Sequence, residues 1–366
     1  MRKLVIVSGL LWACSSAPPA PPAAAPSWPP PRAAAPTAPP PAPPTVDVPP
    51  AEPSDPLAPL PADAAARLGA LRADPPPRAI TRMKHYFVSN ENQHWLWRDV
   101  LRNRGGMLVG VGTDQLYLYA GWSKATLLVP LDFDQWIVDL HWVYGLLFEH
   151  ADTPAELVDL WTFRRQGEVK KLIEERWSDP KEQRKKLRSF SEARADVKQR
   201  LERLRKRHGK RDVDSFMSSQ EQFDWIKRLW AAGRVHPVRG DLTQSVALAD
   251  VAAFSRDTKI PLRTLYLSNA EDYFEFDTGH YKDNVLGLPF DDRSIVLRTK
   301  PYNGDYYEFL YQSGTGFQDW LRADRVKTMC ELARFSHRAS NDKDEKDLYE
   351  VSPVSVTERE RNHRCD

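Results

Sequence analysis

The sequence is poor in cysteine and contains no long apolar run. Its three cysteines, Cys14, Cys330 and Cys365, are too few for a disulfide scaffold, and no Cys-x-x-Cys pair indicates a zinc site. No stretch reaches the ~20 consecutive apolar residues of a membrane-spanning helix, which excludes an integral membrane protein. The nucleophile elbow of Ser-His-Asp hydrolases, the P-loop and the His-Glu-x-x-His zinc motif are also missing, so these enzyme classes are not expected.

The prolines and tryptophans divide the chain of 366 residues into two parts. Of 31 prolines, 23 lie between residues 17 and 77, whereas 10 of the 12 tryptophans lie between residues 95 and 320. The proline-rich part cannot bury an apolar core, but the ~290 residues that follow can. The formal net charge is only +2, so any strongly charged surface has to be local.

The first 14 residues have the pattern of a secretory signal peptide. A basic start is followed by apolar residues at positions 4–11, too few to span a membrane. Leu11, Ala13 and Cys14 then resemble the bacterial lipobox, in which the cysteine is lipidated and becomes the first mature residue. With Ser15 next, the pattern resembles lipoproteins sorted to an outer membrane. We expect a cell-envelope lipoprotein anchored to the membrane at Cys14; an unlipidated signal and a misassigned start are the alternatives.

Two segments are predicted to flank the folded domain without joining it. Residues 15–78 are rich in proline and alanine, and proline fixes φ and removes a hydrogen-bond donor. We therefore predict a disordered, extended linker that holds the domain away from the lipid surface. Residues 336–366 are charged and poor in apolar residues, which predicts a disordered tail. The domain is then expected to span residues 79–335.

Short apolar runs alternate with helical patterns across this domain. The apolar runs predict strands at residues 107–111, 125–131, 234–238, 262–267 and 294–299. Apolar residues at helical spacing predict helices at residues 91–104, 135–149, 216–232, 245–254 and 317–335. Asp134 is placed to cap the second helix, and residues 306–311 predict an antiparallel edge strand after an Asn-Gly turn. This order predicts an α/β fold with a Rossmann-like, doubly wound, mostly parallel sheet.

Residues 164–211 interrupt the alternation with a strongly basic segment. They contain 19 Lys and Arg residues against 8 Asp and Glu residues. Its apolar residues recur at helical spacing at Leu187, Phe190, Val197, Leu201 and Leu204. This predicts an amphipathic helix at residues 190–206 and, with residues 167–177, an inserted helical hairpin. We favour the interpretation that this is a solvated helix face whose charges have no specific partner, and a landing surface for an anionic lipid or polysaccharide is the alternative. Nucleic acid is not expected, because no aromatic residues are interleaved for base stacking.

Polar residues follow four of the predicted strands. They are Gly110, Gly112 and Thr113 after the first strand, Asp132 after the second, Asp241 after the third, and Ser268 and Asn269 after the fourth. In an open parallel sheet, ligands bind beyond the carboxyl ends of the strands, and glycines there let a nucleotide approach the backbone. An acid about 20 residues after the glycines can accept hydrogen bonds from ribose hydroxyls. The pattern predicts one crevice shared by the glycine turn, Asp132 and Asp241.

This set of strand ends resembles class I S-adenosylmethionine-dependent methyltransferases over residues 91–310, apart from the basic insertion. The resemblance implies that Gly110 and Gly112 line the methionine part of the cofactor. It also implies that Asp132 holds the ribose and that Asp241 lies near the adenine amino group.

Two further resemblances concern the end of the sheet and the chain as a whole. Ser268, Asn269 and the strand at residues 295–299 resemble amino-carboxypropyl transferases of betaine-lipid synthesis, which use the same cofactor. The whole chain resembles an uncharacterised family of bacterial lipoproteins with a methyltransferase-like core. These resemblances imply S-adenosylmethionine as the cofactor.

The sequence departs from the methyltransferase pattern at two positions. Leu108 and Val109 stand where an acid usually precedes the first glycine, and Asp114 replaces the third glycine. An ionised Asp114 would repel the carboxylate of the cofactor unless it is protonated or paired. S-adenosylmethionine is moreover cytoplasmic, whereas a lipobox directs the domain outside.

Other acidic groups have structural explanations. Asp132, Asp134, Asp139 and His141 do not form one face, so we expect no metal. Glu271, Asp272 and Tyr273 offer a general base, but acids at a helix start also complement the helix dipole.

Three hypotheses follow from the sequence. The first is a lipid-anchored, exported protein whose methyltransferase-like domain binds a small polar ligand, with catalysis unproven. The second is an active S-adenosylmethionine-dependent transferase. The third is a non-catalytic envelope protein that makes contact through residues 164–211.

Overall fold

An eight-stranded sheet in the order β3-β2-β1-β4-β5-β6-β8-β7 forms the centre of the domain. The computed structural model describes residues 55–80, 83–303 and 306–355. The strands are β1 (Met107–Val111), β2 (Leu127–Asp132), β3 (Val238–Arg239), β4 (Leu262–Tyr266), β5 (Ile295–Asn303), β6 (Tyr306–Ser313), β7 (Ser336–Arg338) and β8 (Leu348–Val351). The predicted strand at residues 107–111 is confirmed residue for residue.

The sheet has the topology of a doubly wound fold. Strands β1 to β5 are parallel, and β1 lies between β2 and β4, so the strand order reverses beside β1. Strand β6 returns antiparallel to β5, as predicted for residues 306–311. The prediction of a Rossmann-like, mostly parallel α/β sheet is therefore confirmed.

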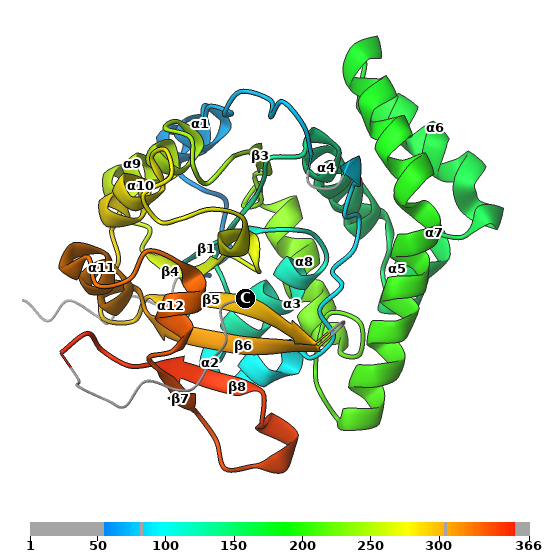
Figure 1. Cartoon of the computed structure of the whole chain (residues 1–366). Coiled ribbons are helices and arrows are strands. Elements are labelled where there is room, and N and C mark those ends of the chain that lie inside the picture. The colour runs from blue at the N-terminus through cyan, green and yellow to red at the C-terminus, as the bar shows by residue number, and fades with distance from the viewer. Residues whose placement is uncertain (1–54, 81–82, 304–305, 356–366) are drawn as a thin grey trace, which may run out of the picture. The chain divides into compact units, whose positions relative to one another are not determined.

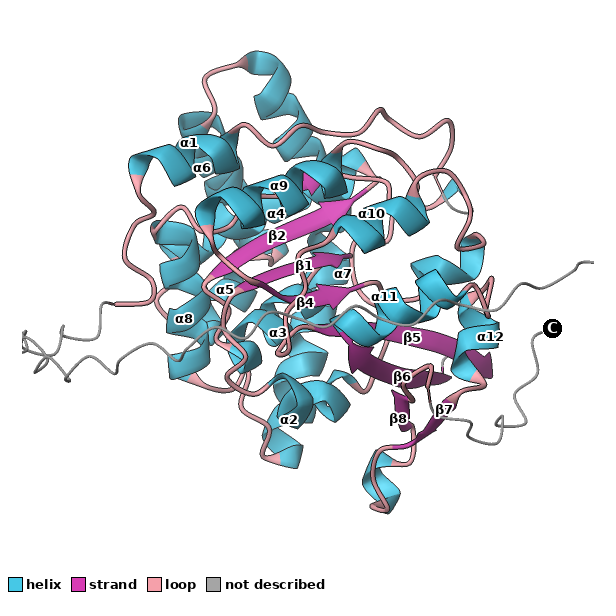
Figure 2. Cartoon of the chain, turned by 90° about the vertical axis from the view of Figure 1, so that its left-hand side faces the viewer, coloured by secondary structure: helices cyan, strands magenta, loops and turns pink. Residues whose placement is uncertain are grey.

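Helices cover both faces of the sheet (Figure 2). The helices are α1 (Ala62–Gly69), α2 (Arg98–Leu101), α3 (Gln115–Ser123), α4 (Gln135–His150), α5 (Pro154–Leu160), α6 (Gln166–Arg176), α7 (Pro180–Arg211), α8 (Gln220–Ala231), α9 (Ala247–Thr258), α10 (Tyr281–Gly287), α11 (Gly314–Ala323) and α12 (Met329–Ala333). Short 3-10 helices are η2 (His94–Trp97), η3 (Phe163–Arg165), η4 (Ala270–Tyr273) and η5 (Lys343–Glu345). Within the described residues, no helix is both long and apolar enough to cross a membrane.

Side chains alternate between the two faces along each strand. In β1, Leu108 packs with α2, α3, α4 and α8, whereas Met107 and Val109 pack with α9, α10 and α11 on the other face. All three side chains are buried. Burial on both faces explains why these strands read as continuous apolar runs in the sequence.

The basic insertion is a helical pair that packs on α4. Helix α6 ends at Arg176, Asp179 caps the next helix by accepting from the backbone N–H of Lys181, and α7 then runs for 32 residues. Figure 1 shows α6 and α7 beside each other, with α4 next to them. The predicted hairpin is present, but its second helix extends well beyond the predicted residues 190–206 because Pro180 begins it and Asp212, in the left-handed region, ends it.

The last third of the predicted linker is part of the folded domain. Leu57 and Leu68 are buried in the two core clusters on opposite faces of the sheet. Helix α1 packs on α9, where Arg67 pairs with Asp257 at 2.8 Å. Widely spaced leucines therefore bind residues 55–78 to the domain despite the neighbouring prolines. Residues 15–54, and the predicted signal peptide with Cys14, lie outside the described residues.

The predicted disordered tail contributes two strands. Strand β8 pairs in parallel with β6, and β7 pairs antiparallel with β8 at the edge, so β6 is not the edge strand that the sequence predicted. Leu348 and Val351 are buried although charged residues surround them, which hid the strand in the sequence. The helix predicted at residues 317–335 is divided into α11 and α12, and Cys330 in α12 is disulfide-bonded.

Candidate functional site

The glycine turn after β1 is closed by the side chain of Gln115. Gly112 has φ of +91°, a conformation that side chains rarely adopt, and a Cβ there would collide with the Gln115 amide. Gln115 Oε1 accepts a hydrogen bond from the Thr113 N–H at 3.1 Å. Gly110 is buried, and a Cβ there would clash with Leu116. The two glycines therefore allow close internal packing, and Gln115 occupies the space over the turn.

Asp114, which replaces the third glycine, forms a buried ion pair with the basic insertion. Its Oδ2 lies 2.9 Å from Nε of Arg200 in α7, and both side chains are almost fully buried. Arg200 also donates from Nη1 to the Glu91 carbonyl at 3.2 Å. The repulsion expected from Asp114 is thus neutralised from within the chain, and the insertion reaches the strand ends through Arg200.

The carboxylate of Glu91 occupies the space beyond the end of β4 and beside the middle of β5. Ser268 Oγ donates to Glu91 Oε1 at 2.6 Å, Thr299 Oγ1 donates to the same atom at 2.5 Å, and Tyr266 OH donates to Oε2 at 2.6 Å. Burial raises the pKa of Glu91, and the three hydroxyl donors oppose that shift. Ser268, predicted to contact a ligand, contacts this internal carboxylate instead.

Asp132 lies beside the glycine turn, as predicted. Its Oδ2 accepts from the Gly112 N–H at 3.3 Å, and its Oδ1 accepts from the Asp134 N–H at 2.9 Å. Burial and the nearby Asp134 carboxylate raise the pKa of Asp132 to about 7, although the two backbone donors act to lower it. Asp132 can therefore exchange a proton near neutral pH.

Asp134 combines its predicted capping role with a histidine contact. Its Oδ1 accepts from the Trp136 N–H at 3.0 Å, which confirms the cap of α4. Its Oδ2 lies 2.6 Å from His85 Nδ1, and the His85 ring stacks on Trp136 with centroids 4.1 Å apart. Within the described residues, no group of three or more His, Cys, Asp or Glu side chains is arranged to hold a metal ion.

The Asp241 carboxylate is used inside its own turn. It accepts from the N–H and the hydroxyl of Thr243 at 2.9 and 2.8 Å. The Asp241 N–H donates to Asp74, a fully buried residue of the predicted linker that also accepts from Val246 N–H at the start of α9. Asn269 is partly exposed and precedes η4.

The predicted site residues therefore divide into three groups. The structure brings Gly112 and Asp132 together and places Ser268 against Glu91. The Asp241 turn adjoins Asp132, because the Gly240 N–H donates to the Asp132 carbonyl at 2.9 Å, but the Asp241 carboxylate itself bonds to Thr243. Sequence reasoning missed Glu91, Arg200 and Asp74. The side chain of each comes from a segment that is far away in the sequence, and no sequence motif indicates such a contact.

S-adenosylmethionine does not fit this arrangement. Gln115 covers the glycine turn, and Glu91 fills the space beside Ser268. A ligand with a carboxylate would also meet the buried Asp114 and Glu91, and Nε of the neighbouring Arg200 is already paired with Asp114.

The Glu271 carboxylate, considered as a general base, is held in a second buried cluster. Its Oε2 lies 2.6 Å from Arg298 Nε, and both side chains are fully buried. Tyr281 OH also donates to Glu271 at 2.5 Å, and Arg298 Nη1 donates to Gln312 at 2.9 Å. These contacts explain Glu271 as a structural partner between η4, α10 and β5.

The outer face of α7 is strongly basic. Helix α7 contains 14 Lys and Arg residues against 4 Asp and Glu residues. We use "the basic face" for Arg203, Arg205, Lys206 and Lys210, which are all exposed. With 3.6 residues per turn, Arg203, Lys206 and Lys210 project within about 60° of one another around the helix axis, whereas Arg205 projects about 100–160° away from them. No carboxylate of the described chain pairs with any of these four, and Glu202 beside them is held by Lys198 at 2.9 Å.

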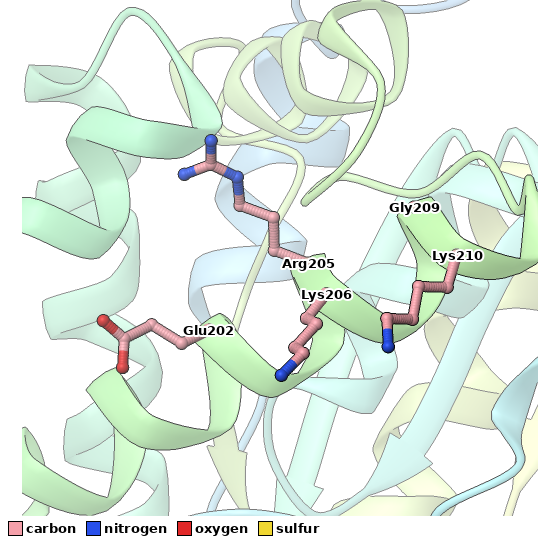
Figure 3. A pocket seen from close by; sticks show the side chains of 5 residues that line it. All are labelled: Glu202, Arg205, Lys206, Gly209 and Lys210. Atoms are coloured by element: carbon pink, nitrogen blue, oxygen red, sulfur yellow. The ribbon is translucent and has the colours of Figure 1, made fainter.

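The basic face borders an open hollow of about 540 Å³ (Figure 3). Arg205, Lys206 and Lys210 line it together with Glu202 and Gly209. Burial and then the charges of Arg200, Arg203 and Arg211 lower the pKa of Arg207. The neighbouring arginines therefore add to the unfavourable effect of burial on the Arg207 charge.

A protein-family model described as "Domain of unknown function (DUF7790)" matches residues 86–352. No curated protein matches the sequence.

Proposed function

The chain belongs to the DUF7790 family, and we propose that its domain is a non-enzymatic docking module of a lipid-anchored envelope protein. Cys14 is the proposed anchor, and the basic face of α7 is the proposed contact with a surface of anionic phospholipid headgroups. The observation that carries this proposal is the set of four exposed cations without ion-pair partners in the described chain.

The contact is supported by charge and by geometry. A helix of 32 residues is ~48 Å long, so α7 can lie along a flat surface. Each Lys or Arg near an anionic membrane contributes about 1 kcal/mol, and the three that share one side of α7, Arg203, Lys206 and Lys210, together correspond to an affinity gain of about 10². Such a contact adds a second membrane signal to a lipid anchor, the combination that stable attachment requires.

The proposal also accounts for the filled strand ends. A nucleotide-binding enzyme needs an open crevice at the switch point of its sheet. Here Gln115, Glu91 and the Asp114–Arg200 pair occupy that region. Arg200 belongs to α7, so the same helix closes the crevice on one side and carries the basic face on the other.

Reversing the charge of the basic face is expected to abolish binding to anionic vesicles. The tested chain is residues 15–366, which keeps the compact unit of residues 53–366 and removes the predicted signal peptide. In sedimentation with phosphatidylglycerol vesicles, the variant R203E/R205E/K206E/K210E should bind at least ~100-fold more weakly, because attraction becomes repulsion. Added salt should weaken binding of the unaltered chain, since the four groups are exposed.

A control variant with the same change in net charge tests whether the position of the cations matters. R256E/R338E/K343E/K346E changes four exposed cations of α9, β7 and the η5 region and should bind nearly as tightly as the unaltered chain. Neither form should bind phosphatidylcholine vesicles. Equal losses in the two quadruple variants, or persistent binding of the α7 variant, would refute the docking surface.

Calorimetry with S-adenosylmethionine is expected to give no binding heat. The expectation follows from the Gln115 amide over Gly112 and the Glu91 carboxylate beside Ser268. The Asp132→Ala variant should behave in the same way. Micromolar binding that disappears in Asp132→Ala would instead favour the transferase hypothesis.

A further inference from the structure

Three arginines follow one another at four-residue intervals along one side of α7. Arg203, Arg207 and Arg211, here called "the arginine row", are separated by about 40° each around the helix axis and by ~6 Å each along it. Side chains with this spacing are neighbours on a helix surface. Arg203 and Arg211 are exposed and Arg207 is partly exposed, so solvent reaches all three side chains.

Two members of the arginine row are held in place by the segment before α2. Arg207 Nη1 donates to the Asn92 carbonyl at 3.1 Å and to Asn92 Oδ1 at 2.8 Å. The guanidinium group of Arg211 lies 4.3 Å from the ring centroid of Trp95. A side chain that is already oriented loses less conformational entropy when it binds a ligand.

The charge of the arginine row is not balanced within the part of the chain that the structure describes. No carboxylate there forms an ion pair with any of the three arginines, whereas Arg200, on the same side of α7, is paired with Asp114. Burial lowers the pKa of Arg207, and the positive charges that lower it further belong to Arg200 and to the other two members of the row. An anion bound at the row would therefore relieve a repulsion that the folded chain contains.

The end of the helix opposes an anion, but more weakly than the row attracts it. Arg211 is the last residue of α7, and the partial charge at a helix C-terminus is about −0.5. Asp212 follows as the cap, and within the described chain no ion pair joins it to the row. Three full positive charges exceed the sum of this partial charge and one carboxylate.

Resting on the docking function above, we propose that the arginine row binds the terminal phosphate of a phosphomonoester lipid headgroup. Such a phosphate has a charge of about −2 and three terminal oxygens, whereas the diester phosphate of phosphatidylglycerol has a single charge and fewer free oxygens. Each planar guanidinium group can donate to two oxygens, so a row of three distinguishes the monoester from the diester. Arg203 belongs to both the row and the basic face, so the phosphate site borders the docking surface.

The experiment compares phosphatidic acid vesicles with phosphatidylglycerol vesicles of equal surface potential at pH 8. Unaltered residues 15–366 should bind phosphatidic acid about tenfold more tightly, because the row donates further hydrogen bonds to the terminal phosphate. The variant R207K/R211K keeps the net charge and the whole basic face but lacks two of the planar forks. It should bind both kinds of vesicle equally, with binding to phosphatidylglycerol within about twofold of the unaltered chain. The matched variant R184K/R205K changes two exposed arginines on other sides of α7 and should retain the tenfold preference.

A soluble phosphomonoester tests the same site without a membrane. Millimolar glycerol 3-phosphate should raise the melting temperature of the unaltered chain by about 2–4 °C relative to sodium chloride of equal ionic strength. R207K/R211K should melt in a single transition, as a folded chain does, and should show no such rise.

Three results would overturn the phosphate site. Equal binding of the unaltered chain to the two kinds of vesicle would do so and would leave the docking function standing. A preference for phosphatidic acid that R207K/R211K retains would show that the row is not its source. Absence of binding to both kinds of vesicle would contradict the docking function and the lipid headgroup together, and a shift with glycerol 3-phosphate would then assign the row to a soluble phosphomonoester.

Discussion

Replacing Arg200 with methionine is expected to lower the free energy of unfolding by about 3–5 kcal/mol. The side chain is 2% exposed and provides the only cation within ion-pair distance of Asp114 among the described residues. Methionine retains much of the volume but leaves Asp114 buried as an unpaired charge, and breaking a buried pair has a cost of this size. Urea unfolding at pH 7, followed by circular dichroism, measures the change.

Two companion variants separate the charge from the packing of α7. Arg200→Met combined with Asp114→Asn removes both charges and should recover at least half of the lost free energy, because no isolated ion remains buried. Arg203→Met, one turn away and exposed, should change the stability by no more than about 0.5 kcal/mol. A cost below about 1 kcal/mol for Arg200→Met would show that water reaches Asp114 and that the crevice is open.

The same ion pair shows where sequence reasoning succeeds and where it ends. Local signals were sufficient for β1, whose apolar run ends at a glycine turn, and for the Asp134 cap of α4. They also predicted that Gly112 and Asp132 are neighbours, since parallel strands bring their carboxyl ends to one edge. In the sequence, Arg200 is one of the 14 Lys and Arg residues of a basic helix, and nothing distinguishes it from the others. Only the packing of α7 on α4 identifies it as buried.

The segments before and after the predicted domain show a different limit. Proline content predicted that residues 55–78 cannot pack, yet buried Leu57, Leu68 and Asp74 help to bind them to the domain. Asp74 accepts from two backbone N–H groups at the start of α9 and from the Asp241 N–H. Its contribution depends on residues more than 160 positions away, which composition cannot reveal. Likewise, β8 is recognisable only beside β6, because its neighbours in the sequence are charged.

Asp132→Asn is expected to stabilise the domain at pH 8 by about 2–4 kcal/mol and to have little effect at pH 4. The folded pKa of Asp132 is about 7, above the ordinary 3.8. Below pH 3.8 Asp132 is protonated in both the folded and the unfolded chain, so it costs no stability. Between pH 3.8 and 7 the unfolded chain ionises at this position more readily than the folded one, so the free energy of unfolding falls as the pH rises through this range. Each pKa unit corresponds to about 1.4 kcal/mol, so the loss approaches ~4 kcal/mol at pH 8. Asparagine keeps an oxygen for the N–H groups of Gly112 and Asp134 but does not ionise.

The pH series from 4 to 8, measured by urea unfolding of both forms, identifies Asp132 as the titrating group. A difference that is the same at every pH would contradict the shifted pKa and make Asp132 an ordinary cap for the turn. A difference that grows between pH 4 and 7 would mean that the domain carries, beside its glycine turn, a carboxyl group that destabilises it at neutral pH. Strongly perturbed carboxyl groups in otherwise stable folds concentrate at functional sites. Asp132 would then be the position at which small ligands should be tested even though Gln115 and Glu91 fill the nucleotide crevice.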